Sequence, residues 1–247
     1  MSAPWHELKF GERTFYPEVR TLKDMESVLF NKRFLANASR DMTLYYMFRD
    51  VSKNEADANK IAQLGLRYDI TIIPPNNLGV EFVKTAGHYH PCPDGSKLTY
   101  PEMYGVLEGE AHYLLQKREE EEPGSEKITD VIVVKAQKGD TVIIPPDYGH
   151  VTINPSESTL KMANWVARAF SSIYEPIEQR KGAAYFELTY GEFIKNDEYE
   201  DVPAIRFLQP EETWSRGLEL SKDRALYDLL QEPEKLAFLT RPDEWFV

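Results

Sequence analysis

Between residues 43 and 167 the chain consists of short β-rich runs separated by turn sequences, and this pattern limits its possible folds more than any other feature. Each run has five to eight residues and is rich in Val, Ile, Tyr, Phe and Thr, which favour strands. The runs are TLYYMF (43–48), YDITII (68–73), VEFVKT (80–85), EMYGVL (102–107), AHYLLQ (111–116), DVIVVK (130–135), DTVIIP (140–145), HVTIN (150–154) and LKMANWVA (160–167). Turn sequences such as PPNN, QKGD and NPSES lie between them. Strands this short and closely spaced are typical of a sandwich or small barrel, so we expect a β-dominated fold.

The segments on either side of this region carry helix signals instead. In TLKDMESVLF, Thr21 and Asp24 are spaced to cap a first helical turn, so a short helix is expected there. Near the other end, the stretch from Asp223 to Gln231 places three leucines on one face and predicts a second helix. Trp214 and Trp245 lie in the same tail and indicate that it packs on the protein's own barrel or on a partner subunit. We therefore expect an N-terminal extension (1–40), a β-barrel domain (41–200) and a C-terminal extension (201–247).

The chain is acidic, and its charge excludes several classes of partner. It has 29 Lys and Arg against 41 Asp and Glu, a formal charge of −12, and so has no general attraction for nucleic acid or anionic membranes. Its single cysteine, Cys92, cannot form an intrachain disulfide. The first residues lack a signal-peptide pattern, and no apolar run approaches the roughly 20 residues of a membrane span. We expect a soluble, cytoplasmic protein with no nucleic-acid or membrane partner.

Three of the five histidines fall in two short segments that together predict a metal site. In GHYHP, His88 and His90 lie two residues apart, so on a strand both side chains project from one face and can share a metal ion. In GDTVIIPPDYGHVTIN, His150 follows a two-proline turn at the start of another predicted strand. Glu102 opens the strand that follows the first pair. Three imidazoles and a carboxylate suit Mn, Fe, Co, Ni or Zn.

These segments resemble the paired motifs of the cupin family. That pattern consists of a glycine, His-x-His, a glutamate and a glycine, followed by a second set of glycine, proline, histidine and asparagine. The cupin spacings are kept from Glu102 to Gly109 and from Gly139 to Asn154, apart from Asp147 where cupins usually have glycine. The resemblance implies a double-stranded β-barrel, or jelly roll, in which three histidines and one glutamate bind a metal.

One interval departs from the cupin pattern. Eleven residues separate His90 from Glu102, where cupins usually have three or four, and three prolines in this interval indicate an inserted loop. The loop offers a rival ligand, Asp94, at the usual distance from His90, and Cys92 is also near enough in sequence to approach the metal. The sequence YGVLEG after Glu102 fits the motif, so Glu102 is the preferred ligand.

The segments TAGHYH, PEMYGVLEG and IIPPDYGHVTIN resemble a narrower family, the cupin-type, or archaeal-type, phosphoglucose isomerases, over about residues 15–205. The resemblance implies interconversion of glucose 6-phosphate and fructose 6-phosphate in glycolysis and gluconeogenesis, by a homodimer with one divalent transition metal per subunit. It assigns the metal ligands to His88, His90, Glu102 and His150, the catalytic roles to Glu102 and Tyr104, and substrate contacts to Tyr45, Thr71, Thr85 and Gly87.

Two positions differ from this family and leave other functions open. The family has a tyrosine and a histidine facing the substrate after the last metal ligand, where this chain has Val166 and Ser172, although Tyr174 is kept. Moving a proton between C2 and C1 of a sugar requires a base, for which Glu102 is the candidate. The alternatives are a cupin dioxygenase, which uses the same set of ligands, and a sugar-binding cupin without catalytic activity.

Overall fold

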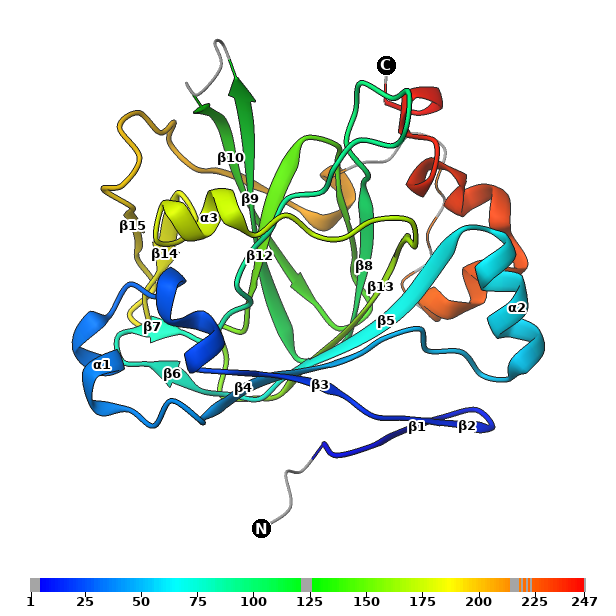
Figure 1. The fold of residues 1–247 in the computed structure, drawn as a ribbon, viewed down its shortest axis with the longest axis horizontal. Coiled ribbons are helices and arrows are strands. Elements are labelled where there is room, and N and C mark those ends of the chain that lie inside the picture. The colour runs from blue at the N-terminus through cyan, green and yellow to red at the C-terminus, as the bar shows by residue number, and fades with distance from the viewer. Residues whose placement is uncertain are drawn as a thin grey trace.

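The structure, a computed structural model, describes residues 5–120, 126–213, 218, 220, 222 and 224–246. Two β-sheets dominate it and together form a barrel, with short helices around the outside (Figure 1). The larger sheet runs in the order β11 (Thr141–Ile144), β8 (Glu102–Glu108), β13 (Leu160–Ala167), β5 (Leu66–Ile73), β4 (Thr43–Phe48) and β3 (Glu18–Thr21). The smaller sheet runs in the order β12 (Tyr148–Ile153), β9 (Glu110–Glu120), β10 (Glu126–Gln137) and β16 (Arg206–Leu208). The expected β-dominated jelly roll is confirmed.

Smaller elements surround the barrel. Two-stranded ribbons are formed by β1 (Leu8–Phe10) with β2 (Arg13–Phe15), β6 (Asn77–Leu78) with β7 (Glu81–Phe82), and β14 (Tyr185–Glu187) with β15 (Phe193–Lys195). The α-helices are α1 (Lys32–Asn37), α2 (Glu55–Gln63) and α3 (Glu175–Gln179). The 3-10 helices are η1 (Lys23–Val28), η2 (Pro210–Glu212), η3 (Leu226–Gln231), η4 (Pro233–Leu239) and η5 (Pro242–Glu244). Across the described ranges, no helix is long and apolar enough to cross a membrane.

Eight of the nine predicted runs lie in strands of the two sheets, but the run at residues 80–85 does not form a strand of its own. Only Glu81–Phe82 pairs regularly there, within the small ribbon. The rest of the segment divides its backbone hydrogen bonds between different partners: Val83 N–H donates to the carbonyl of Asn76, and Thr85 N–H to that of Thr152. Because no single neighbour accompanies the segment, the continuous strand expected from its composition was wrong.

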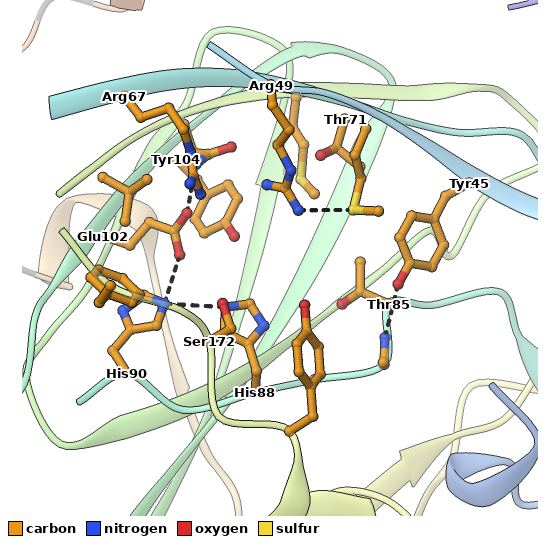
Figure 2. Close-up of a pocket in the computed structure, with 18 residues that line it drawn as sticks. Tyr45, Arg49, Arg67, Thr71, Thr85, His88, His90, Glu102, Tyr104 and Ser172 are labelled. Atoms are coloured by element: carbon orange, nitrogen blue, oxygen red, sulfur yellow. Dashed lines mark hydrogen bonds and ion pairs between the residues drawn. The ribbon is translucent and has the colours of Figure 1, made fainter. Parts of the chain in front are cut away.

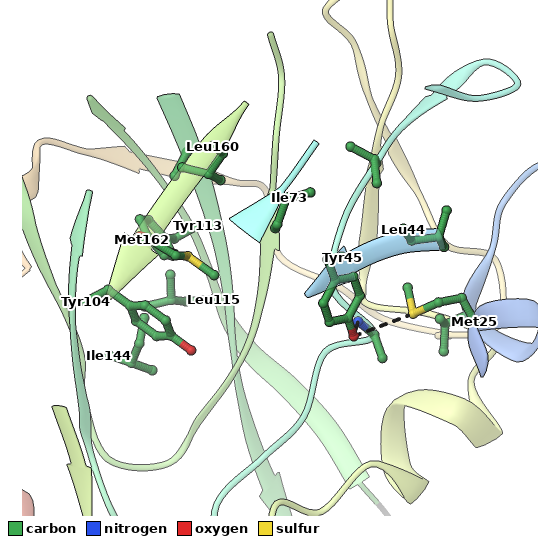
Figure 3. Close-up of a cluster of buried hydrophobic side chains, with 14 of the residues drawn as sticks. Met25, Leu44, Tyr45, Ile73, Tyr104, Tyr113, Leu115, Ile144, Leu160 and Met162 are labelled. Carbon is green, nitrogen blue, oxygen red and sulfur yellow. Dashed lines mark hydrogen bonds between the residues drawn. The ribbon is translucent and has the colours of Figure 1, made fainter. Parts of the chain in front are cut away.

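The interior of the barrel is filled by apolar side chains from both sheets. Figure 3 shows Tyr104 and Met162 of the larger sheet beside Tyr113 and Leu115 of the smaller one, all of them buried. Met25, from η1, extends this cluster toward Tyr45, whose hydroxyl lies 3.9 Å from its sulfur. The N-terminal helix signal therefore marks a segment that packs against the barrel.

The helix signals at both ends give 3-10 helices rather than α-helices. Thr21 donates hydrogen bonds from its N–H and its hydroxyl to Asp24 (2.8 and 2.9 Å), yet the helix begins two residues later, at Lys23. In the tail, η3 covers Leu226–Gln231; Asp223 and Trp214 lie outside the described residues. The exact helix type depends on tertiary packing, which the sequence pattern does not report.

From Leu226 onward the C-terminal extension packs on the outer face of the larger sheet (Figure 1), whereas its strand β16 joins the smaller sheet. Leu226, Leu229 and Leu230 join a cluster with Tyr68 of β5 and Trp165 of β13. The indole N–H of Trp165 donates to the carbonyl of Leu226 (2.9 Å), so a buried polar group is also satisfied. Trp245 contacts Phe238 of η4 in the same cluster. With the barrel interior on the other side, β5 and β13 are buried on both faces.

Candidate metal centre and pocket

Four side chains converge at one end of the barrel. His88 and His90 follow β7 in a segment bridged to β12, Glu102 begins β8, and His150 lies in β12. His88 and His150 are direct antiparallel partners, which explains how residues far apart in sequence meet. Each of the four offers one ligand atom within 4.8 Å of all the others. The structure thus brings together the four residues whose spacing pointed to a metal site.

The distances within this cluster fit a single metal ion. His88 Nε2 lies 3.1 Å from His90 Nε2, and Glu102 Oε2 lies 3.5 Å from His90 Nε2 and 3.2 Å from His150 Nε2. Ligands bound at about 2.1 Å in tetrahedral or octahedral geometry are roughly 3.0–3.4 Å apart. Glu102 Oε2 is also buried without a hydrogen bond, although a buried carboxylate oxygen needs a partner. A cation bound at this point would satisfy it.

His88 and His90 are in the neutral state that binds metals. Burial lowers the pKa of His88 well below its usual value and that of His90 to about 4, so both imidazoles are neutral. His90 Nδ1 lies 2.8 Å from the carbonyl of Tyr100, which fixes Nδ1 as the protonated nitrogen and leaves Nε2 free for a ligand bond. Tyr100 belongs to the inserted loop, so this loop orients a candidate ligand.

Glu102 is held by a residue that the sequence analysis did not single out. The side-chain amide of Asn164, on β13, donates to Glu102 Oε1 at 2.6 Å, and both residues are buried. Burial opposes ionisation of Glu102, but the contacts with His150 outweigh it and lower the pKa of Glu102, so the group is a carboxylate. Asn164 therefore engages one carboxylate oxygen, and the other faces the histidines.

A pocket opens beside this cluster, and all the expected substrate-contact residues line it (Figure 2). They are Tyr45, Thr71, Thr85 and Gly87, and Tyr104, the expected catalytic tyrosine, lines it as well. The hydroxyl of Thr85 accepts the N–H of Thr152 (2.9 Å), and the hydroxyl of Tyr104 lies 3.1 Å from His150 Nε2. Gly87 has a left-handed backbone (φ 80°), and a Cβ there would lie 2.6 Å from a methyl group of Val151, so only glycine fits.

The two positions that differ from the isomerase pattern also face the pocket. Val166 and Ser172 line it together with Tyr174 and with Phe170, which the sequence analysis did not single out. The ring of Phe170 lies 4.5 Å from that of His90 and stacks on Tyr100 at 4.8 Å, closing one wall. Phe170 carries no motif signal, so its role emerges only from the fold.

The rival ligands of the inserted loop lie elsewhere. Asp94 and Cys92 are exposed, and neither belongs to the four-residue cluster that the described part of the chain forms. The loop is instead tied to the second motif, since Thr99 and Asp147 exchange hydrogen bonds between side chain and backbone N–H (2.6 and 3.3 Å). Asp147 has a left-handed backbone (φ 70°), which explains why glycine is usual at this position.

Arg49 and Arg67 also line the pocket, and sequence reasoning missed both. They extend from the β4 and β5 side and pair with the same oxygen of Asp69, at 2.8 Å each. Asp69 is fully buried behind them. A signal did exist: Arg67 and Asp69 alternate with apolar residues in β5 and so share the face of Thr71.

A jelly-roll barrel with three histidines and a glutamate around one point defines a cupin with a candidate metal site. The chain belongs to the glucose-6-phosphate isomerase family, since the family model described as Glucose-6-phosphate isomerase (GPI) matches residues 19–204. The resemblance to cupin-type phosphoglucose isomerases is thereby confirmed. Membership of this family describes the ancestry and the fold of the chain.

Curated relatives agree with the family. The chain is 27% identical over 139 residues to a glucose-6-phosphate isomerase of Thermococcus onnurineus, covering 56% of this chain and 63% of that protein. It is 28% identical over 137 residues to the enzyme of Pyrococcus furiosus, covering 55% and 62%. The matched region thus spans less than two thirds of each relative.

Solved structures with partial similarity include oxalate oxidase in complex with glycolate, with a TM-score of 0.33 and 17% identity over 46% of this chain and 48% of that one. A mutant of Bacillus subtilis oxalate decarboxylase has a TM-score of 0.35 and 15% identity over 57% of this chain and 30% of that one.

Proposed function

We propose that the protein is a metal-dependent aldose–ketose isomerase that interconverts glucose 6-phosphate and fructose 6-phosphate. The observation that carries the proposal is the four-residue cluster of His88, His90, Glu102 and His150 beside a polar pocket in a chain of this family. One divalent transition metal, Fe, Mn, Ni, Co or Zn, would be held by these residues. When bound, it would supply positive charge to the sugar oxygens on which negative charge develops.

In this proposal Glu102 is the base. It removes the proton from C2 of the open-chain aldose and returns it to C1, while the hydroxyl proton on O2 passes to O1. The product is the ketose, so the step consumes no other reactant. Burial and the nearby charge of Glu102 raise the pKa of Tyr104 well above its usual value, so its hydroxyl stays protonated. Tyr104 can therefore donate a hydrogen bond to a sugar oxygen at this end of the pocket.

We assign the rest of the substrate to the other end of the pocket. Thr71, Thr85 and the backbone of Gly87 are proposed to contact its phosphate, and Tyr45 is proposed to contact the sugar. The free volume of the pocket is about 50 Å³. Small-molecule sites usually offer at least roughly 300 Å³, so side chains must move apart to admit a hexose phosphate.

The test is an isomerase assay on chelator-stripped protein. Fructose 6-phosphate is supplied, Mn, Fe, Co, Ni and Zn are added back one at a time, and formation of glucose 6-phosphate is followed. Turnover restored by a metal supports the proposal and ranks the ions. Metal binding without turnover for any ion contradicts it.

The same protein sample distinguishes the remaining functions. Oxygen consumption that depends on Fe(II) would indicate a dioxygenase, which can use the same ligand set. A rise in melting temperature with sugar phosphate, without turnover, would indicate a sugar-binding protein. Val166 and Ser172 are the feature that favours this second candidate, because neither carries an aromatic hydroxyl or an imidazole for the substrate.

We also propose a homodimer located in the cytoplasm. The dimer is supported by the edge strand β3, where Val19 is exposed and Tyr16 beside it is 73% exposed. The location is supported by Cys92, a free, exposed thiol. Light scattering after gel filtration tests the dimer, since a mass near 28.6 kDa would contradict it.

A further inference from the structure

Two arginines share one carboxylate at the edge of the pocket. Arg49 Nη1 and Arg67 Nε each lie 2.8 Å from Asp69 Oδ2, and Asp69 Oδ1 accepts the backbone N–H of Asp50 at 3.0 Å. Asp69 has no exposed surface and does not line the pocket, whereas both guanidinium groups do. The carboxylate therefore holds the two arginines from behind and turns their remaining N–H groups toward the pocket.

This unit carries more positive charge than its own carboxylate neutralises. Glu18 is the other acidic group near Arg49, at 4.0 Å, but its side chain is 64% exposed and therefore well screened by water. Arg49 Nη2 contacts only the sulfur of Met47, at 3.1 Å, and thioethers are weak acceptors. In the described part of the chain, the two Nη groups of Arg67 have no hydrogen-bond partner. These groups remain available to an anion.

The position of Arg49 matches the expected position of a substrate's phosphate. Met47 and Thr71 are direct partners across β4 and β5, so a guanidinium group that contacts Met47 lies on the Thr71 side of the pocket. Figure 2 shows Arg49 reaching into the pocket between Tyr104 and Thr71. Glu102 is on β8, separated from β4 by β5 and β13, so three strand spacings, about 14 Å measured along the sheet, lie between them. With C1 and C2 of the sugar at Glu102, as proposed above, the phosphate assigned to Thr71 would lie toward β4.

We propose that Arg49, held by Asp69 and supported by the second charge of Arg67, binds the phosphate group of the substrate and selects phosphorylated over unphosphorylated sugars. This inference rests on the proposed function for the identity of the sugar. Guanidinium groups present paired N–H donors that match phosphate oxygens, and a partly buried site strengthens that interaction. Threonine hydroxyls and backbone N–H groups supply no net charge, so Arg49 provides what they lack.

The experiment compares the wild type with Arg49→Met and Arg49→Gln. The Gln variant keeps a hydrogen bond to Asp69 without the charge and so remains informative if the Met variant does not fold. Two quantities are measured: the affinity of chelator-stripped protein for inorganic phosphate by calorimetry, and KM and kcat for fructose 6-phosphate with metal restored. We expect phosphate affinity to fall and KM to rise about 10- to 100-fold, with kcat nearly unchanged, because a charge-assisted hydrogen bond to a group remote from the reaction is lost.

A matched control is Arg206→Met. Arg206 forms a similar two-pronged ion pair, with Asp130, but lies on β16 away from the pocket, so both quantities should equal those of the wild type. If both Arg49 variants keep wild-type phosphate affinity and KM, the inference is wrong while the isomerase proposal stands. If the wild type has no isomerase activity but loses phosphate binding on substitution of Arg49, the isomerase proposal is wrong and the phosphate subsite stands.

Discussion

Replacing Asn164 with alanine is expected to weaken metal binding, although Asn164 is not itself a candidate ligand. The amide of Asn164 donates to Glu102 Oε1 at 2.6 Å, and the two residues are only 3% and 4% exposed. This bond leaves Oε2 facing His90 and His150. Without it, the carboxylate is free to rotate away from the position that completes the cluster.

The size of the effect follows from the type of bond. A hydrogen bond to a charged, buried group contributes about 1.5–3 kcal/mol. Loss of an outer partner of a metal ligand typically lowers metal affinity about 10- to 100-fold, which corresponds to roughly 1.4–2.7 kcal/mol. The two free-energy values agree. We therefore expect the dissociation constant for the metal to rise by one to two orders of magnitude in the Asn164→Ala variant.

Cobalt(II) provides a direct assay, because its visible absorption changes when it enters a protein site. Chelator-stripped protein is titrated with Co(II) in competition with a coloured chelator. Asn196→Ala is the control: Asn196 is equally buried, its amide donates to the carbonyls of Arg180 and Ala183, and it lies far from the cluster. The control should lose stability and keep its cobalt affinity. Equal cobalt affinity in Asn164→Ala and the wild type would refute the proposed positioning of Glu102.

Three further substitutions test other parts of the molecule. Glu102→Gln should abolish turnover more completely than it weakens metal binding, measured by kcat and by cobalt titration, and an equal loss of both would reduce Glu102 to a ligand. Thr85→Val should chiefly raise KM for fructose 6-phosphate. It should also lower stability somewhat, because the N–H of Thr152 loses its hydrogen-bond acceptor. An unchanged KM would show that Thr85 does not belong to the phosphate site. Leu230→Ala should lower the free energy of unfolding in urea by about 2–5 kcal/mol with kcat unchanged, because Leu230 is fully buried on the outer face of the larger sheet. Gln231→Ala, at an exposed neighbour, should leave stability unchanged, and equal effects of the two variants would argue against tail packing.

Local sequence was sufficient to locate most strands of the barrel. TLYYMF forms β4 with the bounds expected, and LKMANWVA forms β13, because β-branched and aromatic residues between turn sequences identify strands without further context. The segment VEFVKT has the same composition but no continuous neighbour. Strand formation depends on a partner, and that information is not local. The helix α2 was also missed, although Asn54 caps it, because it buries only Ile61 and so has a weak apolar stripe.

The functional site also contains some residues that the sequence predicts and others that only the fold brings together. His88 and His90 are two residues apart, and this spacing is visible in the sequence. Arg49 meets Asp69 only because β4 pairs with β5 in one register, in which Phe48 is opposite Ile70. Asn164 similarly lies opposite Asp69 on one side and Tyr104 on the other. A shift of one residue would turn these side chains to the other face, so the polar row across the sheet follows from the register and not from any motif.

The C-terminal extension has a consequence for this polar row. In β5 the polar residues of the inner face alternate with Tyr68 and Ile70, which lie in the cluster formed with the tail. Because η3 and η4 cover that outer face, β5 is shielded from water on both sides and Asp69 has no exposed surface. Burial raises the pKa of Asp69, and the charges of Arg49 and Arg67 act in the opposite direction without reversing the shift. The tail thus helps to keep the pocket's charges in a medium where they interact strongly with each other and with an anionic substrate.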